Sequence, residues 1–246
     1  MMPTVELSIV VPAYNEESRL PRTLARIREY LRGSHPASEI IVIDDGSADR
    51  TAEIVRALQT DMPELRLLSN GENRGKGYSV RAGMLAARGE IALFTDADLS
   101  APIEEAGKLL DGLASADVAI GSRALDRRVI QVHQSRAREL AGILFNRMVR
   151  LATGLPFEDT QCGFKAFRMD RARIIFEQQT IADFGFDPEI LFLAQRHGLR
   201  IIEIPVLWAH DPRTKVNMIR DSLRMFADLW QIRWNALAGR YSRQSE

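Results

Sequence analysis

Short apolar runs alternate with longer amphipathic stretches through the first half of the chain, and this alternation constrains the fold most strongly. The runs are rich in Ile, Val and Leu and end in Pro, Gly, Asn or Asp, which is typical of buried strands. The predicted strands are Leu7–Val11, Ile40–Ile43, Leu65–Leu68, Ile91–Thr95 and Val118–Ile120. The intervening stretches predict helices over Arg19–Leu31, Thr51–Leu58, Gly77–Ala87 and Ile103–Ala114. This order predicts an α/β fold with a mainly parallel sheet and helices on both faces.

The second half of the chain is richer in arginine. Residues 123–150 contain seven arginines and two acids, with apolar residues between them. A helix is predicted at about 188–197, a strand at 200–207 and a helical tail at 215–237. The arginine-rich stretch suits a helix lying in a membrane interface, although an ordinary solvated face explains it too. The tail, with Trp230 and Trp234 near Arg233, fits a membrane boundary and a core-packing helix equally well.

Composition excludes several classes of protein. The 246 residues include 33 Lys plus Arg and 33 Asp plus Glu, so no overall positive charge favours nucleic acid. The single cysteine, Cys162, excludes an internal disulfide and a cysteine-based zinc site. No apolar run reaches the roughly 18–20 residues that span a bilayer, and the N-terminus lacks the pattern of a signal peptide. We therefore expect a cytoplasmic protein whose membrane contact, if any, is peripheral.

Three acidic clusters follow predicted strands. Glu16 and Glu17 follow the first strand, Asp44 and Asp45 the second, and Asp96 and Asp98 the fourth. Ligands of open α/β sheets bind beyond the carboxyl ends of the strands, so we expect the clusters to share one rim. Carboxylates crowded in this way repel one another unless a cation or a donor-rich ligand joins them.

The Asp96-Ala97-Asp98 segment is the strongest single signal. Two carboxylates two residues apart can both reach one hard cation, and Mg²⁺ or Mn²⁺ completes such a site with waters and phosphate oxygens. Taken alone, the pattern is explained equally well by a turn or a helix cap.

Four segments in this order, VVPAYNEE, IVIDDGSADRT, NRGKGYSVRAGMLAARGE and LFTDADLS, resemble the family 2 glycosyltransferases of the GT-A fold, which are inverting nucleotide-sugar enzymes. The resemblance extends from about Leu7 to His210. The segments IGSR, DTQCGFKAF and FDPEILFLA look like the dolichyl-phosphate β-glucosyltransferase branch, whereas polyprenyl-phosphate mannosyltransferases share the N-terminal half. The resemblance implies a transferase domain over 1–214, with a nucleotide-sugar half at about 1–121 and an acceptor half at about 122–214. An amphipathic C-terminal helix and tail over 215–246 would follow it.

The resemblance also implies donor-binding residues. Those that would contact the nucleotide-sugar are Pro12, Ala13, Tyr14, Glu16, Asp44, Arg74, Lys76, Asp96 and Ala97. Tyr14 would lie against the base, Glu16 would face the ribose, and Asp44 would accept a hydrogen bond from the base, since a carboxylate is an acceptor. Glycines around Lys76 open a predicted helix and let backbone N–H groups approach phosphate. A turn with a solvated basic cap is the alternative explanation of that loop.

A polyprenyl-phosphate acceptor would explain the arginines. Arg123 and Arg138 are the best candidates for its phosphate, because a guanidinium fork matches phosphate geometry. Lys165, and Lys215 in a basic PRTKV segment, could stabilise phosphate charge. A hydroxyl acceptor needs a general base, for which Asp159 and Asp187 are the candidates, whereas a phosphate acceptor is already ionised. The same two carboxylates could equally position Arg138, Lys165 or the sugar hydroxyls.

The sequence thus predicts an inverting transferase that moves glucose from UDP-glucose to a polyprenyl phosphate at the cytoplasmic membrane face. Its predicted cofactor is Mg²⁺ or Mn²⁺ held by Asp96 and Asp98, with Asp98, Arg123, Asp159, Lys165 and Asp187 as the catalytic group. The alternatives are GDP-mannose as donor, a hydroxyl acceptor, and a nucleotide-sugar-binding protein without transferase activity.

Overall fold

The structure is a computed structural model that describes residues 5–126, 128, 130–132, 136–209 and 218–241. Its strands are β1 (Leu7–Ala13), β2 (Ser38–Asp44), β3 (Leu65–Ser69), β4 (Ile91–Thr95), β5 (Val118–Ser122), β6 (Ile130–Val132), β7 (Phe164–Arg168), β8 (Ile201–Pro205) and β9 (Trp208–Ala209). Its helices are α1 (Leu20–Ser34), α2 (Thr51–Gln59), α3 (Lys76–Ala86), the 3₁₀ turn η1 (Ile103–Glu105), α4 (Ala106–Gly112), α5 (Arg136–Thr153), α6 (Met169–Gln178), α7 (Phe186–Arg196) and α8 (Met218–Leu237).

Seven strands form one sheet in the order β3-β2-β1-β4-β7-β5-β8. Strand β1 runs parallel to β2 and β4, β3 runs parallel to β2, and β5 runs parallel to β8. Strand β7 runs antiparallel to both of its neighbours, β4 and β5. The predicted α/β fold with a mainly parallel sheet is therefore confirmed. A separate two-stranded ribbon joins β6 to β9.

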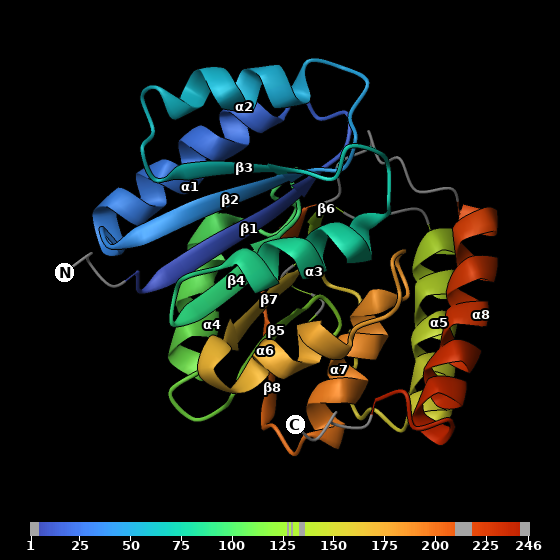
Figure 1. The fold of residues 1–246 in the computed structure, drawn as a ribbon. Coiled ribbons are helices and arrows are strands. Elements are labelled where there is room, and N and C mark those ends of the chain that lie inside the picture. Colours follow the sequence, from blue (N-terminus) through green and yellow to red (C-terminus); the bar gives the residue numbers. More distant parts are fainter. Residues whose placement is uncertain (1–4, 127, 129, 133–135, 210–217, 242–246) are drawn as a thin grey trace.

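Helices cover both faces of this sheet, as Figure 1 shows. Because successive strand residues point to opposite faces, Ile9 and Val11 of β1 pack with α1, α2 and α4, while Val10 packs with α3, α6 and α7. The two cores are built mainly from buried aliphatic side chains of the sheet. The acidic clusters follow the carboxyl ends of β1, β2 and β4, between these layers.

Strand β7 is an element that the sequence pattern did not predict. Its segment, Phe164–Arg168, is buried on both faces but has Lys165 at its second position, which hides the apolar run. Lys165 is fully buried because a carboxylate pairs with its ammonium group, as described below. The predicted helix over Ile103–Ala114 is shorter than expected, since η1 and α4 divide it.

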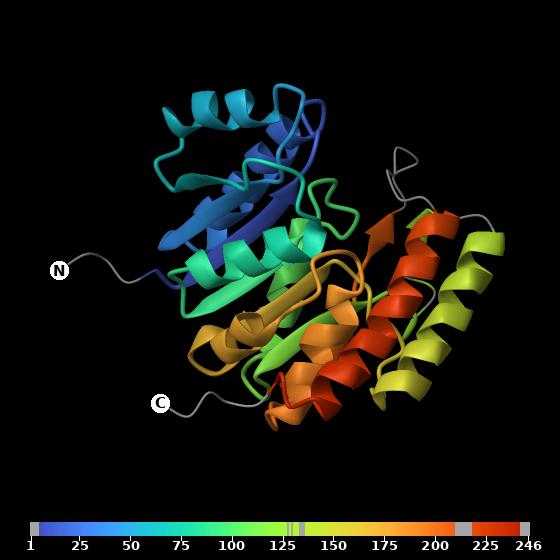
Figure 2. The same cartoon turned by 45° about the vertical axis from the view of Figure 1, so that its right-hand side comes forward.

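Helices α5 and α8 lie side by side at one end of the molecule (Figures 1 and 2), and α8 also packs on α7. Leu229 and Ile232 of α8 enter the core, while Trp230 and Trp234 are exposed. None of the helices within the described ranges combines the length and apolarity that crossing a bilayer requires. The domain boundary at 214/215 and the candidate Lys215 lie outside the described residues, so both stay predictions.

Candidate functional site

The candidate site forms where the strand order reverses. The chain steps outward from β1 to β2 and β3 and then returns to β4 on the other side of β1, which makes this edge a topological switch point. Ala13 at the end of β1 lies opposite Asp44 at the end of β2, and the Asp45 amide donates to the Ala13 carbonyl at 2.9 Å. The acidic clusters after β1, β2 and β4 thus lie along one edge, as their positions in the sequence predict.

The loop after β1 is held by its neighbours. Asn15 adopts a positive φ of 53°, and its side-chain carbonyl accepts the Ala48 amide at 2.8 Å. The Glu16 carboxylate, buried at the site edge, accepts two hydrogen bonds from Arg19, at 2.6 and 2.5 Å. Arg19 Nη1 also lies 3.9 Å from Asp98 Oδ2. Arg19 therefore links the first acidic cluster to the third, while Tyr14 is 40% exposed at the rim.

The aspartates after β2 have separate tasks. Asp44 accepts the Ser47 amide at 3.1 Å and so supports the turn that follows the strand. Asp45 accepts the backbone amides of Arg74 at 2.9 Å and Gly75 at 3.0 Å, and also the Asn70 side-chain amide at 2.7 Å. Asp45 thereby holds the glycine-rich loop that opens α3 against the end of β2.

That loop directs Lys76 toward the Asp-Ala-Asp segment. Lys76 Nζ lies 2.5 Å from Asp96 Oδ1. Burial works against the charge of Lys76, but Asp96 and Asp187 hold the pKa of its ammonium group above the usual value. The lysine is thus a fixed positive charge at the mouth of the candidate donor site.

The Asp-Ala-Asp segment is rigidly placed. The Thr23 hydroxyl donates to the Ala97 carbonyl at 2.6 Å, and Leu99 takes a positive φ of 47°. One Asp98 oxygen accepts the Ser100 amide at 2.9 Å. Burial and the nearby charge of Asp96 raise the pKa of Asp98. Two carboxylates are thus crowded at a partly buried position.

These residues fit a divalent cation. Asp96 and Asp98 offer hard oxygen ligands, and a cation would relieve the repulsion that raises the Asp98 pKa. Within the described part of the chain, no three His, Cys, Asp or Glu side chains gather closely enough to hold a metal by themselves. A cation here would complete its shell with water and substrate phosphate, which is the usual mode of Mg²⁺.

Arg123 and Asp159 form a fork in the half of the chain predicted to bind the acceptor. Arg123 Nε and Nη2 donate to the two Asp159 oxygens at 2.6 and 2.8 Å, and the Arg123 amide adds a third bond at 3.0 Å. Burial disfavours the charged form of both side chains, but the opposite charge and hydrogen bonds of the partner have a larger effect. The pKa of Arg123 is therefore raised and the pKa of Asp159 is lowered. The guanidinium carbon lies 5.4 Å from the centre of a Trp208 ring. Asp159 therefore orients Arg123.

Lys165 and Asp187 form a buried ion pair beneath the site. Lys165 Nζ lies 2.5 Å from Asp187 Oδ1 and donates to the Cys162 carbonyl at 2.6 Å. Burial raises the pKa of Asp187 although Lys165 and Lys76 oppose that shift. Burial and the neighbouring Asp159 raise the pKa of the Cys162 thiol to about 12, so Cys162 is a packed side chain and not a nucleophile.

The remaining predicted residues are less closely gathered. Arg74 stacks on Tyr78, with its guanidinium carbon 3.9 Å from the ring centre. In this structure its guanidinium group therefore contacts Tyr78. Arg138 lies in α5, but its side chain is outside the described set. Arg128 pairs with Asp126, and Arg150 with Glu158, away from the Asp-Ala-Asp segment. The roles assigned to all these site residues stay predictions.

Several residues of the site escaped the sequence analysis. Arg19, Thr23, Gly163 and Trp208 all contact predicted site residues. Arg19 had a local signal, because it stands three residues after Glu16 at helical spacing. The others come from distant parts of the chain and become neighbours only through the sheet.

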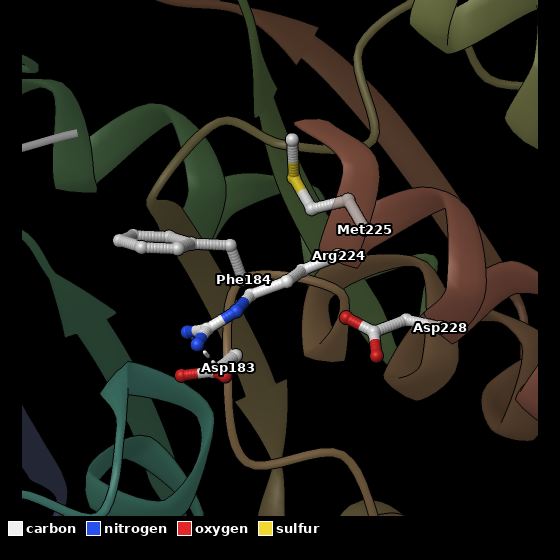
Figure 3. Close-up of a pocket in the computed structure, with 5 residues that line it drawn as sticks. All are labelled: Asp183, Phe184, Arg224, Met225 and Asp228. Atoms are coloured by element: carbon white, nitrogen blue, oxygen red, sulfur yellow. Dashed lines mark ion pairs between the residues drawn. The ribbon is translucent and has the colours of Figure 1, made fainter. Parts of the chain in front are cut away.

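A separate cleft lies between α8 and the segment before α7. Figure 3 shows its lining: Arg224 of α8 reaches toward Asp183, Phe184 and Met225 lie above that pair, and Asp228 lies to its right. Arg224 Nη1 lies 3.7 Å from Asp183 Oδ2. The Gly185 amide donates to Asp228, whereas Asp228 Oδ2 is buried without a hydrogen-bond partner among the described residues. Burial and the charges of Asp183 and Glu189 raise the pKa of Asp228 to about 6.

Solved structures share the fold of this chain. Glucosyl-3-phosphoglycerate synthase of Mycobacterium tuberculosis, crystallised with Mn²⁺, UDP and glucosyl-3-phosphoglycerate, matches with a TM-score of 0.66 at 21% identity, over 92% of this chain and 79% of that one. The mannosyltransferase PcManGT of Pyrobaculum calidifontis, crystallised with GDP-Man and Mn²⁺, matches with a TM-score of 0.62 at 21% identity, over 95% and 64%. The chain therefore has the GT-A fold, as its sequence predicts.

Residues 8–173 match the family described as Glycosyl transferase family 2. The chain is 35% identical to a dolichyl-phosphate β-glucosyltransferase of Trichomonas vaginalis over 242 residues, which are 94% of this chain and 73% of that protein. It is 34% identical to the human dolichyl-phosphate β-glucosyltransferase over 251 residues, or 96% and 78%. The chain belongs to glycosyltransferase family 2, and it is a glycosyltransferase.

Proposed function

We propose that this enzyme transfers glucose from UDP-glucose to a polyprenyl phosphate, with inversion and with a divalent cation at Asp96 and Asp98. The sugar and the class of acceptor follow the names of its relatives, which are dolichyl-phosphate β-glucosyltransferases at 33–37% identity. The uracil base and the cation follow the fold neighbours crystallised with UDP and Mn²⁺ or Mg²⁺.

The observation that carries the proposal is the engagement of both base candidates. Asp159 is bound by Arg123 in a fork, and Asp187 is buried against Lys165. A hydroxyl acceptor would need a carboxylate free to take its proton. A phosphate acceptor needs a cation instead, and Arg123 supplies one at the site. This arrangement favours a phosphate acceptor over a hydroxyl acceptor.

The residues of the chain then have distinct tasks. Lys76, held by the Asp45-bound loop, faces the donor diphosphate, and Arg123, oriented by Asp159, faces the acceptor phosphate. The cation would act as a Lewis acid that neutralises the departing nucleoside diphosphate. The buried ion pair of Lys165 and Asp187 lies beneath the positions proposed for the donor and the acceptor. It would hold this part of the site in place, so that the two substrates meet in one orientation. Because the acceptor is a lipid, we also propose that the enzyme works at the cytoplasmic face of a membrane.

The test is a donor panel with a short-chain polyprenyl phosphate and Mg²⁺ or Mn²⁺, in which the released nucleoside diphosphate is identified. UDP release from UDP-glucose that requires the acceptor supports the proposal. GDP release from GDP-mannose, or transfer to a hydroxyl acceptor only, contradicts it. Asp98→Asn should lose turnover by about a hundredfold or more, because it removes one hard anionic ligand. Full activity of that variant would exclude the cation site.

A further inference from the structure

Helices α5 and α8 leave a set of large apolar side chains in solvent. The exposed ones among the described residues are Leu144 and Leu151 of α5 and Phe226, Trp230, Trp234 and Leu237 of α8. Trp230 is 74% exposed and Leu151 is 87% exposed, which is far outside the range of side chains that pack on a core. Tryptophans are costly to expose, and a group of them on one helix marks an interaction surface.

The spacing shows that each set lies on one face of its helix. Phe226, Trp230, Trp234 and Leu237 recur at intervals of three and four, so they form a stripe along α8. Leu144 and Leu151 are seven apart on α5 and also share a face. The opposite side of α8 is occupied, because Leu229 and Ile232 are buried in the core. The exposed stripe is therefore left over after folding.

Arginine stands within both faces. Arg233 is exposed on α8 three residues after Trp230, and Arg147 is exposed on α5 three residues after Leu144. The described side chains of these two faces include no acid. An arginine can keep its head in water while its stem lies along apolar surface. Tryptophan combined with arginine is the composition of membrane-interface helices.

We propose that the α5–α8 face, defined as Leu144, Arg147, Leu151, Phe226, Trp230, Arg233, Trp234 and Leu237, docks on the surface of an anionic lipid bilayer. The positive charge of the two arginines favours an anionic bilayer over a second copy of the chain as the partner of this face. A second copy would bring arginines to arginines across a two-fold axis, whereas anionic head groups offer them opposite charge.

The face is joined to the active site. The Tyr241 hydroxyl, just after α8, donates to Glu189 of α7 at 2.6 Å, and the Asn235 amide donates to Thr180 at 3.0 Å. Helix α7 carries Asp187, the partner of Lys165, in its first turn. Docking would therefore hold the catalytic edge at a fixed height above the lipid. That the acceptor comes from this bilayer rests on the proposed function, but the docking does not.

The test is flotation of the full-length protein with vesicles of phosphatidylcholine alone and with added phosphatidylglycerol. Wild type should float with the anionic vesicles, and more salt should weaken its binding. The double variant Trp230→Gln/Trp234→Gln should bind at least about tenfold more weakly, since each loses an interfacial aromatic group. Arg233→Glu should also weaken binding, whereas Arg233→Lys should not. Arg56→Glu, at an exposed arginine of α2 on another part of the molecule, is the matched control and should change nothing.

Circular-dichroism melting curves should show that all variants fold, because every altered side chain is exposed. Wild-type binding that ignores lipid charge, or a double variant that floats like wild type, overturns the proposal. A dimer in sedimentation that the double variant dissociates would assign the face to a second copy, and would overturn it too. If the protein docks but transfers no glucose, the proposed function fails alone. If it transfers to a soluble short-chain acceptor but never docks, only the docking fails.

Discussion

Gly163 lies against the carboxylate of Asp96, so closely that a Cβ on residue 163 would overlap its oxygens. The two residues are neighbours because β7 runs antiparallel to β4, with Phe164 opposite Thr95. The start of β7 therefore meets the end of β4. The backbone of the DTQCGFKAF segment thus forms one wall of the Asp-Ala-Asp site.

Gly163→Ala should impair catalysis more than folding. The added methyl group must displace the Asp96 carboxylate, which is the mobile end of a side chain, so the backbone can stay in place. We expect turnover to fall about tenfold or more, the equivalent of about 1.4 kcal/mol in the barrier, with little change in melting temperature. Steady-state kinetics and thermal melts of Gly107→Ala, where the space is open, provide the control. Wild-type turnover of Gly163→Ala would show that the position of Asp96 is unimportant.

Asp45→Asn should weaken donor binding. The substitution replaces an acceptor oxygen by an NH₂ group facing the amides of the loop that carries Lys76. A buried carboxylate that loses such bonds should cost about 1–3 kcal/mol of folding free energy. We expect the KM for the nucleotide-sugar to rise about tenfold while kcat changes less, because the loop that meets phosphate is misplaced and not removed.

The control for Asp45→Asn is Glu53→Gln, which alters an exposed ion pair on α2 and should leave kinetics and stability as they are. An equal loss of kcat and kcat/KM in Asp45→Asn would contradict the proposed task of Asp45. Such a result would mean that Asp45 stabilises only the transition state and does not contribute to donor binding.

The strand pattern and the strand-end acids were readable in the sequence because both are local. Each run of Ile, Val and Leu ends within a few residues of its acidic cluster, so that topology alone brings Asp44 and Asp96 to one edge. That order predicted the α/β fold with a mainly parallel sheet, whereas the GT-A fold was implied by the family resemblance. The loop that opens α3 was predictable too, because its glycines and the helix start are adjacent in the chain, while the donor role of Lys76 stays a prediction implied by the resemblance.

What the sequence could not show are the long-range pairings. The sequence left Asp159 and Asp187 as either general bases or positioning groups, and the fold places Arg123 and Lys165 against them, 36 and 22 residues away in the chain. A buried lysine in the middle of a strand interrupts the apolar pattern that predicts a strand. Its burial is explained only by the carboxylate that pairs with it. Propensity and spacing carry no information on such pairs.

The Lys165–Asp187 pair offers a test that separates stability from function. Lys165→Met should leave a buried carboxylate unpaired and cost about 3–5 kcal/mol of folding free energy. The double variant Lys165→Met/Asp187→Leu removes both charges and should recover most of that stability. It should still lose transfer activity, because the charged floor of the site is gone. Urea unfolding and the transfer assay measure the two effects, and an active double variant would make the pair purely structural.

The Asp228 carboxyl should make stability depend on pH in a definite direction. Its pKa is raised to about 6 by burial and by the charges of Asp183 and Glu189, while the Gly185 amide and Arg224 act in the opposite direction. The folded protein thus binds a proton at Asp228 more tightly than the unfolded chain does. This contribution is present below about pH 4 and is lost as the pH rises through about 6.

Asp228→Asn should therefore stabilise the protein at neutral pH and change little at about pH 4. Asparagine keeps an oxygen for the Gly185 amide but carries no charge near Asp183, so the penalty of ionisation disappears. Since Asp228 is partly exposed, we expect a gain of only about 1 kcal/mol, or a rise of roughly 2–4 °C in melting temperature. Urea unfolding across this pH range measures it, with Asp170→Asn at an exposed carboxylate of α6 as the control. A gain that is equal at both ends of the range would mean that Asp228 is not protonated in the folded protein, and would remove the charge of Asp183 as the cause.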